Sequence, residues 1–111
     1  MDCIFCKIIA KEIPCDLIYE DERFIAFHDI EPQAPVHFLV VPKVHYPANG
    51  AMTQEKGELL ADIFDKIPQI AKSLGVDDYR IVNNNGAQAG QTIFHLHFHV
   101  LGGRDMAWPP G

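Results

Sequence analysis

Short apolar segments separated by polar or proline-containing turns dominate the sequence up to residue 42. Three of these segments predict strands: residues 17–19, 24–27 and 37–41. The polar residues 20–23 form the turn between the first two strands, and Pro42 ends the third. Residues 3–10 predict a short helix or turn, which ends at Ile13-Pro14 because the residue before a proline avoids the helical region.

A longer segment after Thr53 has its apolar residues at helical spacing. Thr53 is a good N-terminal cap, and Gly75 is a good C-terminal stop. The apolar positions of the predicted helix are Leu59, Leu60, Ile63, Phe64, Ile67, Ile70, Ala71 and Leu74. We expect Pro68 to kink the helix or tighten a turn, because proline lacks a backbone N–H. The pattern predicts one long amphipathic helix.

The last third of the chain returns to strand patterns. Residues 79–83 predict a fourth strand, residues 84–91 a loop rich in glycine and asparagine, and residues 94–101 a fifth strand that Gly102-Gly103 ends. Five short strands, one long helix and one short helix predict a single α+β domain over residues 1–111, with a mainly antiparallel sheet.

Composition narrows the class of protein. The chain has 111 residues, of which 48% are hydrophobic, enough for one domain with a core. No apolar run approaches the ~18–20 residues of a membrane span, and Met1-Asp2-Cys3 does not open a secretory signal. We therefore expect a cytoplasmic protein without a membrane partner. The net charge of −6 gives no electrostatic footprint for nucleic acid, so local donors must hold any phosphate group.

Three histidines alternate with apolar residues in the segment Phe94-His95-Leu96-His97-Phe98-His99-Val100-Leu101. Side chains alternate between the faces of a strand, so the three imidazoles share one face at steps of ~6.6 Å. Leu96, Phe98 and Val100 share the other face and can pack on the helix. Imidazole serves as nucleophile, acid, base or metal ligand. The pattern indicates a catalytic or metal site, with a purely structural polar face as the alternative.

The loop that precedes these histidines favours catalysis. Residues 83–92 combine glycine with short polar side chains, which can offer hydrogen-bond donors to an anion. Such a loop is by itself most often a simple turn, but next to a row of histidines it suits a phosphate group beside a nucleophile. A metal-binding module that uses the His-x-His-x-His pattern directly stays an alternative, although it leaves this loop and Asp29 unexplained.

The signature-like part of the chain is Gly90-Gln91-Thr92-Ile93-Phe94-His95-Leu96-His97-Phe98-His99-Val100-Leu101, which resembles the histidine triad (HIT) family. The resemblance extends along the chain and is closest to the nucleotide-binding protein branch of that family. The further segments that carry it are Ile4-Phe5 with Lys7-Ile8-Ile9, Ala26-Phe27-His28-Asp29-Ile30, Pro32-Gln33-Ala34-Pro35 with His37, Val41-Pro42-Lys43, Gly102-Gly103-Arg104 and Trp108-Pro109-Pro110-Gly111.

This resemblance implies a HIT-like fold and a homodimer with two-fold symmetry. Antiparallel edge strands and a long apolar helix also invite self-pairing. The C-terminal tail, residues 104–111, is expected near the active site of the partner, with Trp108 as its apolar anchor. A disordered terminus is the alternative.

The resemblance also implies hydrolysis of purine nucleoside phosphoramidates or acyl-adenylates. His97 would attack the α-phosphorus and form a nucleotidyl-imidazole, which water then cleaves, and neither a metal nor an organic cofactor is needed for that chemistry. His99 would contact the phosphate or the leaving group, and His37 matches the family's fourth catalytic-site histidine, which lies behind the triad. Thr92, with Gly90 and Gln91, would hold the phosphate oxygens. The alternatives are a diadenosine polyphosphate hydrolase and a non-catalytic module that binds nucleotide or metal.

Further positions match the nucleotide pocket of that branch, whose ligand is AMP, GMP or a phosphoramidate of either. Asn84 matches an asparagine near the phosphate and sugar, and His28 matches a pocket position. Asp29 is the expected ribose partner, because one carboxylate can accept from both hydroxyls. The candidates for the base slot are Phe5, Ile8, Phe27 and Ile30. Core packing is the alternative for these four residues, and a turn aspartate is the alternative for Asp29.

Cys3 and Cys6 form a Cys-x-x-Cys motif, a spacing that lets two thiolates reach one tetrahedral ion. The total of three cysteines argues against a disulfide framework. Some histidine triad relatives with such a pair bind zinc through it and two histidines, and that resemblance implies His45 and His95 as the remaining ligands. Zinc would then be structural. The alternative is that both cysteines are reduced and pack as small hydrophobic residues.

Overall fold

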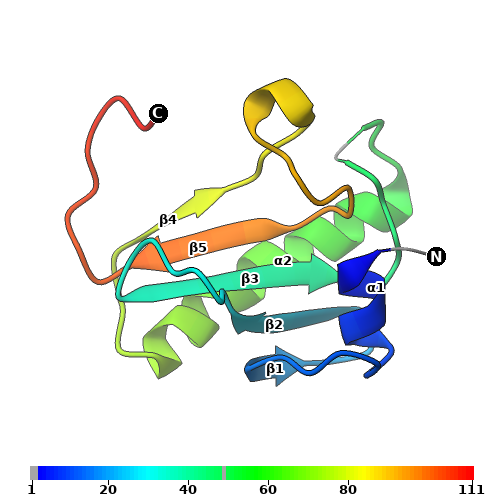
Figure 1. Ribbon diagram of the computed structural model, residues 1–111, viewed down its shortest axis with the longest axis horizontal. Helices are drawn as coiled ribbons and strands as arrows, with labels where there is room; N and C mark the ends of the chain where they lie inside the picture. Colours follow the sequence, from blue (N-terminus) through cyan, green and yellow to red (C-terminus); the bar gives the residue numbers. More distant parts are fainter. Residues whose placement is uncertain (1–2, 49) are drawn as a thin grey trace.

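One antiparallel sheet forms the centre of the protein, described here by a computed structural model (Figure 1). Residues 3–48 and 50–111 are described, and within them the sheet has five strands in the order β1-β2-β3-β5-β4. The strands are β1 (Leu17–Glu20), β2 (Phe24–His28), β3 (Val36–Pro42), β4 (Tyr79–Val82) and β5 (Phe98–Gly102). The helices are α1 (Ile4–Ile9), α2 (Gln54–Ser73) and the 3-10 helix η1 (Ala87–Ala89). The predicted α+β class is confirmed, while Met1 and Asp2, on which the expectation about a signal rested, lie outside the described residues.

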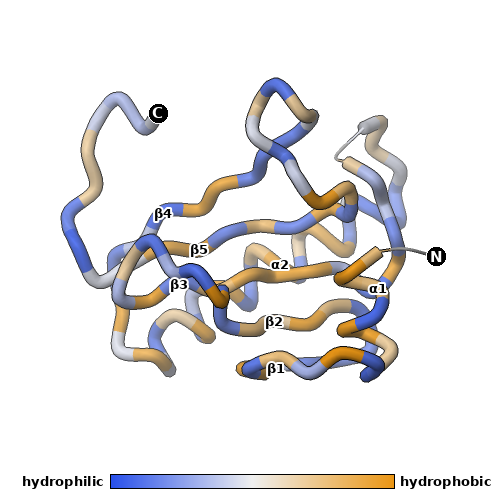
Figure 2. The backbone as a smooth tube through the Cα atoms, in the orientation of Figure 1, coloured by the Kyte–Doolittle hydropathy of each residue, from blue (hydrophilic) through white to orange (hydrophobic). Residues whose placement is uncertain are grey.

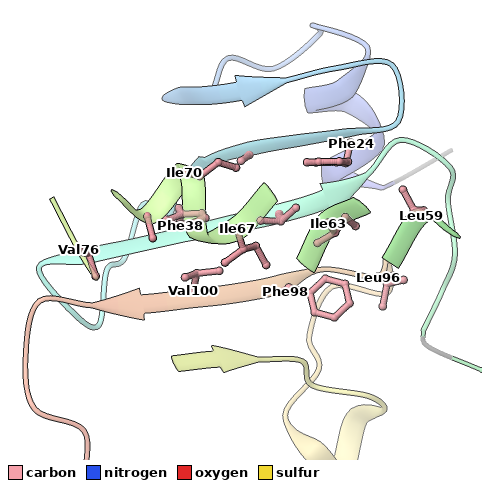
Figure 3. Close-up of a cluster of buried hydrophobic side chains, with 13 residues drawn as sticks. Phe24, Phe38, Leu59, Ile63, Ile67, Ile70, Val76, Leu96, Phe98 and Val100 are labelled. Atoms are coloured by element: carbon pink, nitrogen blue, oxygen red, sulfur yellow. The ribbon is translucent and has the colours of Figure 1, made fainter. Parts of the chain in front are cut away.

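Helix α2 covers one face of the sheet (Figure 3). The hydroxyl of Thr53 caps it by accepting a hydrogen bond from the N–H of Lys56 at 3.2 Å, as the sequence predicts. The core on this face is formed by Phe24, Ala26, Phe38, Val40, Leu59, Ile63, Ile67, Ile70, Ala71, Val76, Leu96, Phe98 and Val100. Phe64 is an exception to the predicted face: it is 47% exposed, with its ring at the edge of Phe98.

Helix α1 covers part of the opposite face. A second core lies there, formed by Cys3, Phe5, Ile8, Ile25, Phe27, Leu39 and Val41. Because both faces of the inner strands are covered, β2 and β3 are almost continuously hydrophobic, as Figure 2 shows. Because α1 covers only part of its face of the sheet, the rest of that face is available to polar side chains.

The fifth strand begins later than the sequence predicts. Residues 94–97 lie outside the β ladder, which starts at Phe98 opposite Val40. Their backbone groups are used elsewhere: the carbonyl of His97 accepts from the side chain of Asn83 at 2.9 Å, and the N–H of Leu96 donates to the carbonyl of Tyr46 at 2.6 Å. The predicted alternation still holds, because Leu96 faces the core under α2 while His95 contacts Phe5 on the α1 side.

Pro68 lies on the exposed side of α2, and the helix continues through it to Ser73. The proline therefore does not end the helix. Among the described residues, no helix combines the length and the apolar character that crossing a bilayer requires.

Candidate active site and metal-binding cluster

An open cleft with a volume of about 380 Å³ lies on the α1 side of the sheet. It is bounded by α1, the C-terminal end of β2 with the loop that follows, and the segment from Asn84 to His99. A volume of this size lies within the range of small-molecule sites. The cleft brings together residues that are more than 90 positions apart in the sequence.

One half of the cleft is apolar. The four residues expected in the base slot, Phe5, Ile8, Phe27 and Ile30, all line it. Phe5 and Phe27 are buried and meet edge to face with ring centroids 5.8 Å apart, whereas Ile30 is 94% exposed at the entrance. Such a slot offers two rigid walls and one open apolar side chain to a flat ring.

The other half of the cleft is polar. Its predicted members are His28, Asp29, Asn84, Gly90, Thr92, His97 and His99, and all of them line the cleft. Among the described residues that line it, none is lysine or arginine. An anionic group in this cleft would therefore be held by neutral donors rather than by cations.

The orientation of His97 is set by its own backbone neighbour. Its Nδ1–H donates to the carbonyl of His95 at 2.7 Å, and this bond leaves the lone pair on Nε2. Burial lowers the pKa of His97, against the opposing effects of that hydrogen bond and of Asp29. A neutral imidazole with a free Nε2 lone pair is the form that a nucleophile requires.

His37 and His99 form a second directed pair. The N–H of Gln33 donates to Nδ1 of His37 at 3.0 Å, so neutral His37 carries its proton on Nε2. That Nε2–H donates to Nδ1 of His99 at 2.9 Å, and His99 therefore carries its own proton on Nε2. His97 and His99 thus differ in their tautomers, one with a lone pair and the other with a donor at Nε2. His37 itself is buried behind His99 and does not line the cleft.

The pKa values of this pair are lowered by the same cause. Burial, together with the neighbouring His97 and His37, lowers the pKa of His99 to about 4, while Asp29 opposes them. Burial also lowers the pKa of His37, again against Asp29. Both imidazoles are consequently neutral near pH 7.

Asp29 lies beside these histidines. Its Oδ1 accepts from the N–H of Glu31 at 2.8 Å, and its Oδ2 is 3.5 Å from Nε2 of His37 and 3.9 Å from Nδ1 of His99. Three possible metal ligands thus meet here. The hydrogen bond from Gln33 keeps a proton on His37 at the nitrogen that faces the group, which disfavours a cation there.

The loop before β5 is held in shape by Gln91. Its Oε1 accepts from the N–H of Gly86 at 2.8 Å, and its Nε2 donates to the carbonyls of Pro47 and Ile93. Gln91 is buried and does not line the cleft, unlike Gly90 and Thr92 on either side of it. Gly90 has a φ of 96°, a left-handed conformation that glycine adopts without strain.

Trp108 lies outside the cleft. It is 83% exposed and borders a separate shallow groove with Arg80 and Asn83 beside β4. The guanidinium of Arg80 donates to the carbonyl of Ala107 at 2.9 Å and so holds the tail along this edge strand. Within one chain, the tail does not contribute to the cleft.

Several residues that the sequence pattern does not single out also belong to the site. The cleft is also lined by Ile4, Glu31, Leu39 and Ile93. Asn83 does not line the cleft but holds the segment before β5 by donating to the carbonyl of His97. The three consecutive asparagines give no signal that separates Asn83 from Asn84. The alternation in β3 does place Leu39 on the same face as His37, which could have identified it.

Cys3, Cys6, His45 and His95 form a compact cluster at the N-terminal end of α1, with their ligand atoms all within 4.8 Å of one another. Nδ1 of His95 is 3.3 Å from the sulfur of Cys3 and 3.6 Å from that of Cys6. Nδ1 of His45 is 3.3 Å from the sulfur of Cys6 and 3.1 Å from Nδ1 of His95. Tetrahedral zinc, with bonds of about 2.3 Å to sulfur and 2.0–2.1 Å to nitrogen, places its ligand atoms roughly 3.3–3.8 Å apart. The donor set fits a zinc ion.

His95 has the hydrogen bonding of a metal ligand. Its Nε2–H donates to the carbonyl of Pro42 at 2.7 Å, so the lone pair lies on Nδ1, the atom that faces the two cysteines. Its side chain is completely buried, and burial lowers its pKa, which keeps the ring neutral. His95 is thus separated in role from His97 and His99, although all three come from one segment.

The sequence of this chain is similar to those of a known protein family. The model of the HIT domain family matches residues 10–106. An uncharacterised HIT-like protein of Synechocystis is 51% identical over 111 residues, which span 99% of this chain and 97% of the relative. A second uncharacterised HIT-like protein, from Synechococcus elongatus, is 49% identical over the same shares of both chains.

Solved structures share the fold. A HIT family hydrolase from Legionella pneumophila Philadelphia 1 superimposes with a TM-score of 0.94 and 43% identity, covering 99% of this chain and 100% of that one. A zinc-bound histidine triad family protein from Mycobacterium smegmatis superimposes with a TM-score of 0.81 and 36% identity, covering 95% of this chain and 77% of that one.

Proposed function

This chain belongs to the HIT domain family, and from that premise we propose that it hydrolyses purine nucleoside phosphoramidates. The observation that carries the proposal is the opposite tautomers of two histidines in one cleft. His97 presents a lone pair at Nε2, and His99 presents an N–H donor at Nε2. A nucleophile beside a hydrogen-bond donor suits substitution at phosphorus.

The proposed reaction has two steps. Nε2 of His97 forms a bond to the α-phosphorus while the bond from phosphorus to the amine breaks, and the amine leaves with the electron pair and takes a proton from water. Water then attacks the phosphorus and His97 leaves as a neutral imidazole. The nucleoside monophosphate keeps one proton of that water, and the other proton neutralises the hydroxide left by the first step. Throughout, the Nε2–H of His99 donates to a phosphoryl oxygen.

The remaining residues of the cleft would hold the nucleotide. The carboxylate of Asp29 would accept from the ribose hydroxyls, and the apolar half around Phe5 and Ile30 would receive the purine. Asn84, Gly90 and Thr92 lie on the polar side, where the phosphate would bind. Gln91 would contribute by shaping the loop, since its side chain is bonded within it.

The absence of basic side chains favours phosphoramidates over the alternative substrates, diadenosine polyphosphates. No lysine or arginine is among the described residues that line the cleft, whereas Asp29 and Glu31 are. A monoanionic phosphoramidate fits such a site, while a polyphosphate brings several negative charges that nothing there compensates.

We also propose that zinc is bound by Cys3, Cys6, His45 and His95. The ion would cross-link α1, the segment after β3 and the segment before β5, and its role would be structural. The zinc-bound relative from Mycobacterium smegmatis is consistent with this proposal. A zinc site with two thiolates suits the reducing cytoplasm, which is where we place the protein.

A turnover assay tests the proposed function. Adenosine phosphoramidate and diadenosine polyphosphates are offered side by side to the purified protein, and AMP release is measured. We expect a higher kcat/KM for the phosphoramidate. Turnover of the polyphosphate alone would identify the alternative hydrolase, and binding of AMP without turnover of either substrate would identify a non-catalytic nucleotide-binding module.

A further inference from the structure

The cysteine pair of the metal-binding cluster is part of the helix that forms the apolar wall of the cleft. Cys3 caps α1 by accepting from the N–H of Cys6 at 3.3 Å, and Phe5 lies between the two cysteines in the sequence. Ile4, Phe5 and Ile8 of the same helix line the cleft. Any change in the cluster that moves α1 must therefore move this wall.

Phe5 connects the wall to the nucleophile. Its ring meets the ring of His97 edge to face at 5.0 Å between centroids, and it meets His95 in the same way at 5.9 Å. Phe5 is 3% exposed, so it is packed between the cluster and the nucleophile rather than free to adjust.

A second connection runs through the backbone of His95. The ring of His95 presents Nδ1 to both cysteines, while its carbonyl accepts the Nδ1–H of His97. His95 would thus bind the metal with its side chain, while its backbone carbonyl fixes the tautomer of His97, the proposed nucleophile. Its position is further set by the carbonyl of Pro42 at the end of β3.

We propose that metal occupancy of this cluster positions Phe5 and His97, so that metal and nucleotide bind with positive coupling. Cys3, Cys6, His45 and His95 are then positioning residues for the nucleotide site. A helix as short as α1, with six residues, is not stable by itself and depends on its attachments to the sheet. Without a shared ion, the cysteines offer Nδ1 of His95 only weak thiol donors, and α1 loses a strong attachment to the segment before β5.

Coupling of this kind is reciprocal. If the metal strengthens AMP binding by some factor, AMP must strengthen metal binding by the same factor. Couplings between sites in one protein commonly amount to about 5–150-fold. A purely structural zinc ion, one that stabilises the fold without affecting the cleft, gives a factor of one.

The first experiment measures both directions of the coupling on the full-length protein. Zinc affinity is determined by competition with a chromophoric chelator, with and without saturating AMP. AMP affinity is determined by calorimetry on zinc-loaded and on zinc-stripped protein. We expect both dissociation constants to change by the same factor, at least 5-fold. Equal zinc affinities with and without AMP would overturn the inference.

A second measurement tests the coupling without removing the metal, for the case in which the zinc-stripped protein unfolds. Cobalt(II) is substituted for zinc, and the visible absorption of the cobalt–thiolate centre is recorded while AMP is added. We expect the bands to shift as AMP saturates the cleft, because Phe5 and His95 link the two sites. A spectrum unchanged at saturating AMP would contradict the coupling, since it would show ligand geometry indifferent to the nucleotide.

Matched variants separate positioning from loss of the fold. Cys6→Ala removes one ligand and should weaken AMP binding by the coupling factor. Cys6→His, which keeps a metal ligand, should restore binding at least in part. Cys15→Ala is the control, because Cys15 is a half-buried cysteine outside the cluster. Equal AMP affinity in all three variants would argue against the inference.

The inference rests on the proposed function only in assuming that the cleft binds a nucleotide. Its readouts are AMP affinity, metal affinity and the cobalt spectrum, none of which requires turnover. Coupling without hydrolysis would support the inference and reject the phosphoramidase. Hydrolysis without coupling would do the reverse, and failure of AMP to bind the zinc-loaded protein would reject both.

Discussion

At the scale of single residues, hydrogen bonds to the backbone assign different tasks to chemically identical side chains. His95, His97 and His99 alternate in sequence, and the sequence alone places them on one face. Their proton positions follow from the carbonyls of Pro42 and His95 and from the chain of donors that begins at the N–H of Gln33. Pro42 and Gln33 come from other segments, and the contact with the carbonyl of His95 depends on a local backbone conformation. The pattern of residues 94–101 therefore could not separate the roles of the three histidines, whereas the resemblance implies that His97 is the nucleophile.

Replacement of His97 tests its role as nucleophile. His97→Asn should lower kcat for adenosine phosphoramidate by several orders of magnitude, because the amide of asparagine offers no nucleophilic ring nitrogen in place of Nε2. AMP should still bind, since the rest of the cleft is unchanged, and calorimetry measures this directly. Near-normal turnover by the variant would contradict the assignment.

Asp29 is the second residue whose role can be measured separately. Asp29→Ala should weaken AMP binding by about 1–3 kcal/mol, the usual cost of losing hydrogen bonds to a charged group. AMP that lacks both ribose hydroxyls is the matched ligand, and its affinity should differ little between the variant and the wild type. If both ligands lose the same affinity, Asp29 supports the cleft through His37 and His99 rather than binding ribose.

The low pKa of His99 predicts a loss of stability in acid. The pKa is about 4 in the folded protein, against ~6.5 for an unperturbed histidine, so the unfolded state binds the proton more readily. The contribution is therefore complete above pH 6.5 and is lost as pH falls towards 4. The full loss from this group is about 3 kcal/mol.

The measurement is urea unfolding of the wild type and of His99→Gln at pH 7 and pH 4.5, both in the presence of the same chelator. Because the side chain of His99 is only 22% exposed, we expect a clear difference. The wild type should lose more stability than the variant over this interval. Equal losses would mean that His99 does not carry the acid sensitivity.

At the scale of elements, the periodicity of hydrophobic residues was sufficient to predict most of the secondary structure. It gave the existence of all five strands and of α2, because each has one or two buried faces that local sequence reports. The start of β5 was wrong by four residues, since the alternation of residues 94–97 reports burial and not hydrogen bonding. The side chains of Asn83 and His97 donate to the carbonyls of His97 and His95, which a β ladder would otherwise use. The local sequence gives no sign of these hydrogen bonds.

Gly102 at the end of β5 gives a test of packing between elements. A Cβ atom there would lie 2.5 Å from Cγ1 of Val76 and 3.0 Å from the carbonyl oxygen of Asp78. Gly102→Ala should destabilise the protein by about 1–3 kcal/mol, the cost of overpacking, as measured by urea unfolding.

Gly57→Ala is the matched control for that substitution. Gly57 lies inside α2, and a Cβ there would meet only the side chain of Met52 at 3.8 Å. It should stabilise the protein by about 0.4–1 kcal/mol, since alanine has less freedom to lose on folding. If Gly102→Ala also stabilised the protein, the side chain of Val76 and the loop at Asp78 would have to move aside at no energetic cost, which would contradict the prediction.

At the scale of the whole molecule, charge is arranged to leave substrate binding to short-range contacts. The net charge is −6, and the cleft is lined by two carboxylates and by histidines, of which His97 and His99 are neutral near pH 7. Long-range electrostatics therefore repel an anionic substrate, and because salt screens this repulsion, the rate of association should rise with ionic strength. The net charge alone argues against electrostatic attraction of nucleic acids. The charges that line the folded cleft are needed to extend this argument to small anionic substrates.

The edge strand β4 and the tail beside it provide the last prediction, that the protein is a two-fold dimer. Within the described part of the chain β4 is an edge strand, and Trp108 leaves a large apolar ring 83% exposed on a tail that Arg80 holds in place. Covering both in a second copy would remove an exposed strand edge and an exposed apolar anchor. We expect the mass of a dimer by sedimentation at micromolar concentration, and a monomer there would refute it. Deletion of residues 106–111 should then alter the ratio of kcat/KM between two phosphoramidates with different amines, because the tail would lie near the leaving group in the partner's cleft. An unchanged ratio in a dimeric deletion variant would leave the tail without a role in substrate choice.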